Sequence, residues 1–379
     1  MNSKELIANM IKHQPFDRLA LYEGFWDETL VAWMDQGYPS KTIVKDGRDR
    51  IVPVDPFHHF TYDLHRCGGF FDTEPFFGQK EIIEETDEWE IRLDGAGATL
   101  KWWKNKSGTP EHIDFRMNSR AVWEQDYRPH LLQPDRRRFN GKWWGDGTLC
   151  DDRSELALAR SRDQWAWVGH VFLWEIMRSS LGDLTMYQNL LLDPGWILDF
   201  NRVYTDFLKV HFRILFAENG VPDGAWLFDD MAYKSGLFAS PKVLNELFLP
   251  FYVEIVSFFK DEYGLPVLFH SDGRIHQAIP ILLEAGFVGL HPLENKAGCD
   301  PVELAKQFGD RLIFVGGFDV RIFETNDRDL IASKMKSLLQ EIQARKVGYV
   351  FGSDHTITPL VKYDTYRFAL DVFEQYRYL

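Results

Sequence analysis

The chain has 379 residues, of which 45% are hydrophobic and 26% are charged. These values are typical of a globular protein and exclude a largely disordered or fibrous chain. Its 43 basic and 57 acidic residues give a formal net charge of −14. Because an acidic surface repels phosphate groups, this charge argues against nucleic acid as the main partner.

No apolar run approaches the roughly 20 residues that a membrane-spanning helix needs. The N-terminal segment also lacks an apolar stretch of the signal-peptide type, so we expect a cytoplasmic protein without a membrane partner. The three cysteines, Cys67, Cys150 and Cys299, are far apart and have no CxxC spacing. Neither a disulfide framework nor a zinc site made of cysteine alone is therefore expected.

In the N-terminal half, strands are predicted at residues 19–23 and 165–168, and a helix is predicted around residues 173–181. Residues about 40–150 differ, because alternating stretches such as 89–93 and 98–103 favour a β-hairpin. We expect this region to elaborate the fold rather than to form a separate domain. Residues 1–379 are therefore predicted to be one domain.

In the C-terminal half, short apolar runs alternate with helical stretches. The predicted strands are residues 225–229, 266–270, 287–291, 312–316 and 349–352. The predicted helices are residues 240–264, 275–285, 302–308 and 327–345, of which the first should bend at Pro250. This alternation is typical of βα units around a parallel sheet.

Each of the five C-terminal strand runs ends in reactive side chains. If the strands form a parallel barrel, their carboxyl ends meet at one mouth, where such folds carry their active sites. The residues that we expect to converge there are Asp229, His270, Glu294, Asp319 and His355. Apolar strands need no acidic or imidazole groups at their ends, so their repetition favours a functional site.

Each residue also has a structural interpretation. Asp229 or Asp230 could cap the next helix or turn, and His270 could be a core histidine with a backbone partner. For His291 the structural interpretation is favoured, since Pro292 restricts its backbone to an extended form. The functional interpretation is favoured for Glu294. It is also favoured for Asp319 and for the pair Asp354 and His355, because glycines precede them and permit close approach of a ligand.

Taken in order, several motifs between residues about 223 and 360 resemble the uroporphyrinogen decarboxylase superfamily. They are Asp229-Asp230, the helix opened by Ser240-Pro241, His270-x-x-Gly273, His291-Pro-Leu-Glu294, Gly316-Gly317-x-Asp319 and Gly352-Ser353-x-His355. The resemblance implies a (β/α)₈ TIM barrel with its site at the carboxyl ends of the strands. The superfamily holds haem-pathway decarboxylases and methyltransferases that work with corrinoid proteins.

Two departures from the superfamily patterns separate these branches. The decarboxylases carry an Arg-rich segment of the form RQAGRY, whereas residues 20–26 here read ALYEGFW, and an acidic mouth would repel a polycarboxylate. The zinc methyltransferases carry His-x-Cys and a later Cys, whereas this chain has His270-Ser271-Asp272 and Gly352-Ser353. A zinc site drawn from His270, Glu294 and His355 remains chemically possible.

The resemblance therefore predicts an enzyme that transfers a methyl group from a small, perhaps methoxyaromatic, donor to a corrinoid carried by a partner protein. A homodimer is a possible assembly. The candidate catalytic residues are Asp229, His270, Asp319 and His355. The candidate substrate-binding residues are Glu23, Trp26, Asp230, Asp272 and Asp354. The alternatives are a decarboxylase of uroporphyrinogen or of a smaller acid, and a barrel that binds a corrinoid or small ligand without catalysis.

Overall fold

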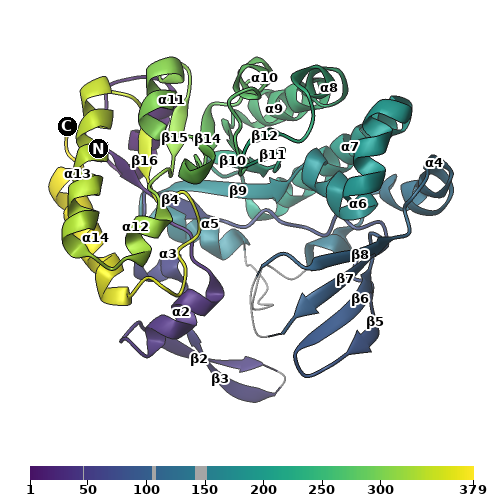
Figure 1. The fold of residues 1–379 in the computed structure, drawn as a ribbon, viewed down its shortest axis with the longest axis horizontal. Coiled ribbons are helices and arrows are strands. Elements are labelled where there is room, and N and C mark those ends of the chain that lie inside the picture. Colours follow the sequence, from purple (N-terminus) through teal and green to yellow (C-terminus); the bar gives the residue numbers. More distant parts are fainter. Residues whose placement is uncertain (46, 105–107, 141–151) are drawn as a thin grey trace.

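The computed structural model describes residues 1–45, 47–104, 108–140 and 152–379, so Cys150 lies outside the described residues. Its largest sheet has eight strands, and all neighbouring pairs are parallel (Figure 1). In sheet order, these strands are β1 (Ala20–Leu21), β16 (Tyr349–Phe351), β15 (Ile313–Val315), β14 (Gly289–His291), β13 (Val267–His270), β10 (Gly224–Phe228), β9 (Trp165–Val171) and β4 (Leu64–Arg66). The sheet curls into a nearly closed barrel, which confirms the predicted (β/α)₈ fold.

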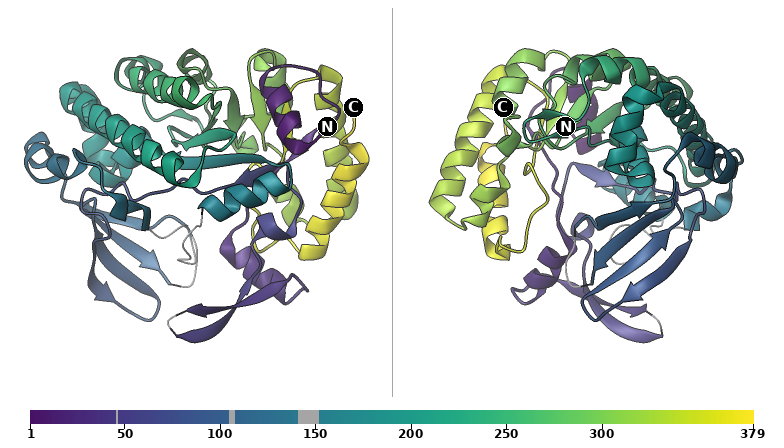
Figure 2. Two further views of the ribbon diagram at one scale, coloured as in Figure 1. Left: turned by 180° about the vertical axis from the view of Figure 1, so that it is seen from behind. Right: turned by 45° about the vertical axis from the view of Figure 1, so that its right-hand side comes forward.

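Helices surround the barrel strands and bury their outward faces (Figures 1 and 2). In chain order, they include α5 (Asp152–Ser161), α6 (Leu173–Leu192), α7 (Pro194–Asn219), α8 (Pro241–Leu247), α9 (Leu249–Tyr263), α10 (Ile279–Ala285), α11 (Pro301–Phe308), α13 (Arg328–Arg345) and α14 (Tyr363–Tyr376). Further helices are α2 (Asp27–Met34), α3 (Pro56–His59), α4 (Arg120–Val122) and α12 (Val320–Glu324). None of the helices in the described part of the chain is long and apolar enough to cross a membrane.

A second core fills the inside of the barrel. Helix α1 (Ser3–Ile11) contributes Leu6, Ile7 and Met10 to this core, together with side chains from the strands. The strand contribution includes three fully buried tryptophans, Trp165, Trp167 and Trp226. Because the interior is packed with side chains, any ligand must bind at the carboxyl-end mouth rather than inside the barrel.

Two long helices are interrupted. The helix predicted over residues 240–264 divides at Phe248 into α8 and α9, and Pro250 lies in the first turn of α9, where proline is tolerated. Helix α6 runs further than predicted and breaks at Gly182, which has φ 72°. A Cβ atom at Gly182 would lie 2.4 Å from the Phe115 ring, so only glycine fits both the backbone and the packing there.

The region about 40–150 holds two antiparallel sheets on one side of the barrel (Figures 1 and 2). One is the hairpin of β2 (Ser40–Lys45) and β3 (Arg48–Pro53). The other contains β5 (Lys80–Glu85), β6 (Trp89–Asp94), β7 (Ala98–Trp103) and β8 (Glu111–Phe115). The predicted hairpin is β6 and β7, and a third small hairpin, β11 (Ala232–Tyr233) and β12 (Gly236–Leu237), follows β10.

The same region also contains the barrel strand β4, which the sequence prediction missed. Leu64 points into the barrel core, whereas His65 has a fully buried side chain bonded to Glu155 of α5 (Nε2 to Oε2, 2.8 Å). His58 of α3 also bonds Glu155, at 3.0 Å from Oε1. One carboxylate thus ties α3, β4 and α5 together.

Replacing Glu155 with Gln should therefore cost stability in a pH-dependent way. Burial alone would raise the pKa of Glu155, but its hydrogen bonds with His58 and His65 lower it to about 2, and the pKa of His58 is raised above 6.5 by the bond to Glu155. A lowered carboxyl pKa stabilises the fold above about pH 4.5, and a raised histidine pKa stabilises it below about pH 6.5. In urea unfolding, the free energy of unfolding should fall most, by about 1–3 kcal/mol, between these two pH values. The loss should be smaller at pH 3 and at pH 8.

Glu303→Gln, which removes only an exposed pair with Lys306, is the matched control and should cost little at any pH. A loss from Glu155→Gln that stays constant from pH 3 to pH 8 would contradict this assignment.

Candidate functional site

Three side chains lie in one layer where β10, β13 and β14 end. In the strand register, Phe228 of β10 is opposite His270 of β13, which is opposite His291 of β14. Matching positions on parallel strands point to the same face of a sheet. All three side chains therefore face the carboxyl-end mouth of the barrel.

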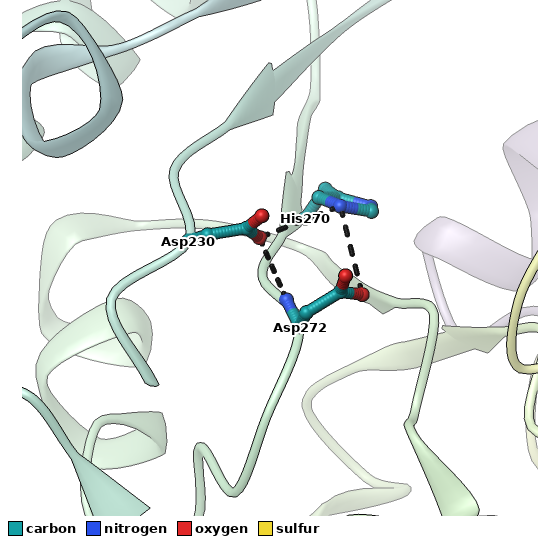
Figure 3. Close-up of side chains that lie close together, drawn as sticks. All are labelled: Asp230, His270 and Asp272. Carbon is teal, nitrogen blue, oxygen red and sulfur yellow. Dashed lines mark hydrogen bonds and ion pairs between the residues drawn. The ribbon is translucent and has the colours of Figure 1, made fainter. Parts of the chain in front are cut away.

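His270 is held between a second histidine and two carboxylates. Its Nδ1 atom is 2.6 Å from Nδ1 of His291. Its Nε2 atom is 3.5 Å from Oδ1 of Asp230 and 3.9 Å from Oδ1 of Asp272. Figure 3 shows the three side chains Asp230, His270 and Asp272 turned towards one another at the ends of β10 and β13.

Asp230, His270 and Asp272 could hold a metal ion, because their ligand atoms all lie within 4.8 Å of one another. The backbone N–H of Asp272 donates to Oδ1 of Asp230 over 2.7 Å, so the turn after β13 orients Asp230. The three side chains are partly buried, with Asp272 the most open at 38% exposure. A substrate could therefore reach them from the mouth.

Aromatic rings form the floor beneath the histidines. Trp226 contacts His291 edge-on at a centroid distance of 4.7 Å, and Phe228 lies 5.0 Å from His270. Tyr22, which follows β1, packs against both Trp226 and His291. Trp226 is fully buried, whereas Phe228 and Tyr22 are half-buried, so an apolar surface lies directly below the polar groups.

Burial sets the protonation of several groups at the mouth. It holds the pKa of His291 well below its ordinary value, and the neighbouring His270 and His355 act in the same direction. Burial also raises the pKa of Asp272, and it raises that of Glu23 to about 7. His291 is therefore neutral at physiological pH, and Glu23 is close to half protonated.

Two predicted catalytic carboxylates cap helices. Asp229 is fully buried; Oδ1 accepts from the N–H of Glu175 in the first turn of α6, and Oδ2 accepts from the Tyr252 hydroxyl over 2.5 Å. Asp319 is the N-cap of α12 and pairs with Arg321 at 2.6 Å. Both residues lie at the expected end of the barrel, but their carboxylate oxygens are already bonded to other residues of this chain.

Two further acidic residues hold the loops of the mouth. Glu294 accepts from the N–H of Gly273 over 2.6 Å and pairs with Lys296 at 3.2 Å. Asp354 accepts from the backbone N–H groups of Asn295 and Val320, each over 2.9 Å. They therefore shape the loops around His270 without touching it.

His355 lies on the other side of Asp272, with Nε2 3.8 Å from Asp272 Oδ2. Glu23 is buried and accepts from the backbone N–H and hydroxyl of Ser353 at 3.0 and 2.7 Å. Trp26 is 36% exposed at the N-cap of α2. Of the predicted zinc ligands His270, Glu294 and His355, only His270 lies in the Asp230–His270–Asp272 cluster.

The sequence interpretation missed two residues near the mouth. His291 was interpreted as structural, although its strand run has the same length as that of His270 and also ends in histidine. Glu175, in the first turn of α6 after β9, was not considered because it sits in an apolar helical run. Burial, followed by Asp230 and Asp229, raises the pKa of Glu175 to about 8, so it is mostly protonated at neutral pH.

Comparison with known proteins agrees with this architecture. Residues 196–376 match the family model of uroporphyrinogen decarboxylase (URO-D). A methyltransferase from Methanosarcina mazei has a similar fold, with a TM-score of 0.61 and 12% identity over 99% of each chain. A psychrophilic glycoside hydrolase family 10 endo-beta-1,4-xylanase aligns with a TM-score of only 0.37 and 9% identity over 63% of this chain and 86% of its own.

No curated protein sequence matches the chain significantly. The family match covers the strands from β10 to β16, which contribute Asp230, His270, Asp272, His291 and His355 to the mouth. The similarity to the Methanosarcina mazei protein extends the same fold over the whole barrel, including the N-terminal strands. Residues 196–376 therefore resemble the uroporphyrinogen decarboxylase family, and the barrel fold extends over the whole chain.

Proposed function

We propose that this protein is a methyltransferase that activates a small methyl donor at a divalent metal ion bound by Asp230, His270 and Asp272. The proposed acceptor is a corrinoid carried by a separate corrinoid-binding protein, as the superfamily resemblance implies. The single observation that carries the proposal is the cluster itself, because it lies where the zinc methyltransferases of the superfamily carry His-x-Cys.

The donor set fits a divalent ion without thiolates. Imidazole nitrogen and carboxylate oxygen are both ligands for zinc and for other divalent transition ions. Ligands about 2.0–2.2 Å from one ion at tetrahedral angles lie about 3.4 Å apart. The separations of 3.5 and 3.9 Å between His270 Nε2 and the two carboxylates are close to this value, and all three ligand atoms lie within 4.8 Å of one another.

This ligand set differs from the predicted one. Asp230 and Asp272, expected to bind substrate, take the places expected for Glu294 and His355. Glu294 is already bound to the Gly273 amide and Lys296. Two carboxylates and one histidine leave coordination positions open for a donor, as catalytic sites require.

Methyl transfer breaks the bond between the methyl carbon and an oxygen or other heteroatom of the donor. The heteroatom keeps the bonding electrons and becomes a better leaving group when it is protonated or bound to a Lewis acid, which is the chemistry that the metal supplies when bound. Phe228 beside His270 and Tyr22 beside His291 offer apolar ring surface at the mouth, which suits a methoxyaromatic donor.

His355 is the proposed proton donor to the leaving heteroatom. Its Nδ1 is 2.6 Å from the carbonyl oxygen of Asp354, and a carbonyl only accepts, so Nδ1 carries a hydrogen. Nε2, which lies 3.8 Å from Oδ2 of Asp272, can then donate only when the ring is an imidazolium. The side chain is 30% exposed, so it can exchange its proton with water.

His355→Gln should lower the rate of methyl transfer from a methoxybenzoate to reduced cobalamin by about 10²-fold. The bound metal, measured by elemental analysis, should stay unchanged because His355 is not a ligand in this account. His59→Gln is the control, since His59 bonds Tyr363 away from the mouth, and it should keep full activity. Loss of the metal in His355→Gln would assign that residue to the ligand set instead.

Decarboxylation fits the mouth less well. Asp230 and Asp272 add two carboxylates to the mouth, and like charges repel an acid substrate. The remaining alternative, a binding barrel without catalysis, predicts that a donor or corrinoid binds while no methyl group is transferred. The cobalamin assay distinguishes it directly from the proposed function.

A further inference from the structure

The contact between His270 and His291 requires one shared proton. Two imidazole nitrogens that lie 2.6 Å apart form a hydrogen bond only if one of them carries a hydrogen and the other does not. The direction of this bond decides what His270 presents to Asp230 and Asp272. Among the residues that the structure describes, neither Nδ1 atom has a second hydrogen-bond partner that would decide the direction.

We infer that His291 is a positioning residue: it accepts a hydrogen bond from Nδ1–H of His270 and so keeps the Nε2 lone pair of His270 available between Asp230 and Asp272. This inference rests on the proposed metal centre, since its consequence is a preorganised ligand. Histidines that bind metals usually donate their second N–H to a carboxylate or a backbone carbonyl. In this barrel a second, neutral histidine takes that role.

The surroundings of His291 favour the acceptor role. The ring is half-buried, with Trp226 and Tyr22 packed against it. A neutral imidazole has one bare nitrogen and can accept at it. His270 faces two carboxylates with Nε2. A neutral His270 ring that keeps the Nε2 lone pair for a metal has its hydrogen on Nδ1, so Nδ1 of His291 must accept.

The strand register makes this contact a fixed feature of the barrel. His270 and His291 are opposite each other on neighbouring parallel strands, and their ring centroids are 4.8 Å apart. The N–H of Ser271 also donates to the carbonyl oxygen of His291 over 3.1 Å. The pairing of the two strands therefore fixes the separation of the two rings.

The test combines a nitrogen-15 NMR measurement on the full chain with metal titration. The wild-type spectrum should show a hydrogen on Nδ1 of His270 both without metal and with Zn²⁺, and a bare Nδ1 on His291. His211 is an internal reference, because its Nδ1 donates to the Phe207 carbonyl oxygen and its Nε2 accepts from the Asp135 N–H. A bare Nδ1 on His270 would overturn the inference.

Two substitutions test the consequence for binding. His291→Asn keeps an acceptor oxygen near the position of Nδ1, whereas His291→Phe keeps the ring shape and removes the acceptor. We expect His291→Phe to weaken Co²⁺ binding by about 10–100-fold, the usual effect of losing a partner that orients a ligand. His291→Asn should restore most of the affinity, and His211→Phe, a buried histidine away from the mouth, should not change it.

Equal Co²⁺ affinity in wild type and folded His291→Phe would overturn the inference, as would equal losses in the Asn and Phe variants. If His291→Phe does not fold, the wild-type spectrum decides the direction of the bond. A wild-type chain that binds no metal at His270 refutes the proposed metal centre instead, and the hydrogen on Nδ1 of His270 still tests the role of His291.

Discussion

His270→Ala should remove the bound metal and lower methyl-transfer activity by about 10⁴-fold. Lewis-acid activation contributes several kcal/mol to such a reaction, and each 1.4 kcal/mol corresponds to about a tenfold change in rate. Because ligands of one ion act as a unit, adding Asp272→Ala to His270→Ala should cause little further loss. Metal content and cobalamin methylation, measured on the same preparations, check both expectations.

Asp310→Asn is the control for this series, since Asp310 is 80% exposed on the surface and should leave metal and activity unchanged. If His270→Ala keeps its metal and its activity and loses only stability, His270 is a packed core residue. The site would then have to be sought elsewhere in the barrel.

The largest expected effect on stability is at Asp63, where the barrel closes. Strands β1 and β4 share no regular ladder, but the N–H of Asp63 donates to the Leu21 carbonyl oxygen and the N–H of Leu21 donates to the Asp63 carboxylate. The same carboxylate pairs with Arg18 at 2.7 Å and Arg377 at 2.9 Å, all three side chains being largely buried. One side chain thus joins both edge strands and both ends of the chain.

Asp63→Ala removes the buried carboxylate from two largely buried arginines, of which Arg377 still pairs with Glu374, and should lower the free energy of unfolding by about 3–5 kcal/mol. Urea unfolding monitored by tryptophan fluorescence measures this loss. Asp17→Ala, which removes a pair between the N-terminal amine and a half-exposed carboxylate, should cost less than about 1 kcal/mol. Similar losses in both variants would show that Asp63 does not close the barrel.

The βα units of the C-terminal half could be predicted because their strands are apolar on both faces. The barrel strands β10, β13, β14, β15 and β16 are each buried throughout or nearly so. Such strands are typical of parallel sheets. Strand β4 could not be predicted in this way. Its short Leu64–Arg66 sequence contains two polar residues, and His65 is buried only because Glu155, about 90 residues later, bonds it.

The place of the site could also be predicted, but the roles of its residues could not. The carboxyl ends of parallel strands share one mouth wherever the strands are correctly identified. Whether a carboxylate at such an end faces a ligand or caps a helix depends on the next element. Asp229 and Asp319 are used by α6 and α12, whereas Asp230 and Asp272 turn to His270.

His291 shows what an argument from the local sequence leaves out. Pro292 does restrict the backbone of His291, and this led to a purely structural interpretation of the side chain. The register between β13 and β14 then places its ring against His270. Comparing the two strand runs, which both end in histidine after four residues, would have indicated this contact.

The most direct test of the proposed metal centre is anomalous diffraction from crystals of the wild-type protein soaked in Zn²⁺. A single strong peak within about 2.0–2.2 Å of His270 Nε2 and of one oxygen each of Asp230 and Asp272 is the predicted result. A peak at another group of residues, or no peak at the mouth although the crystals take up zinc elsewhere, would contradict the account.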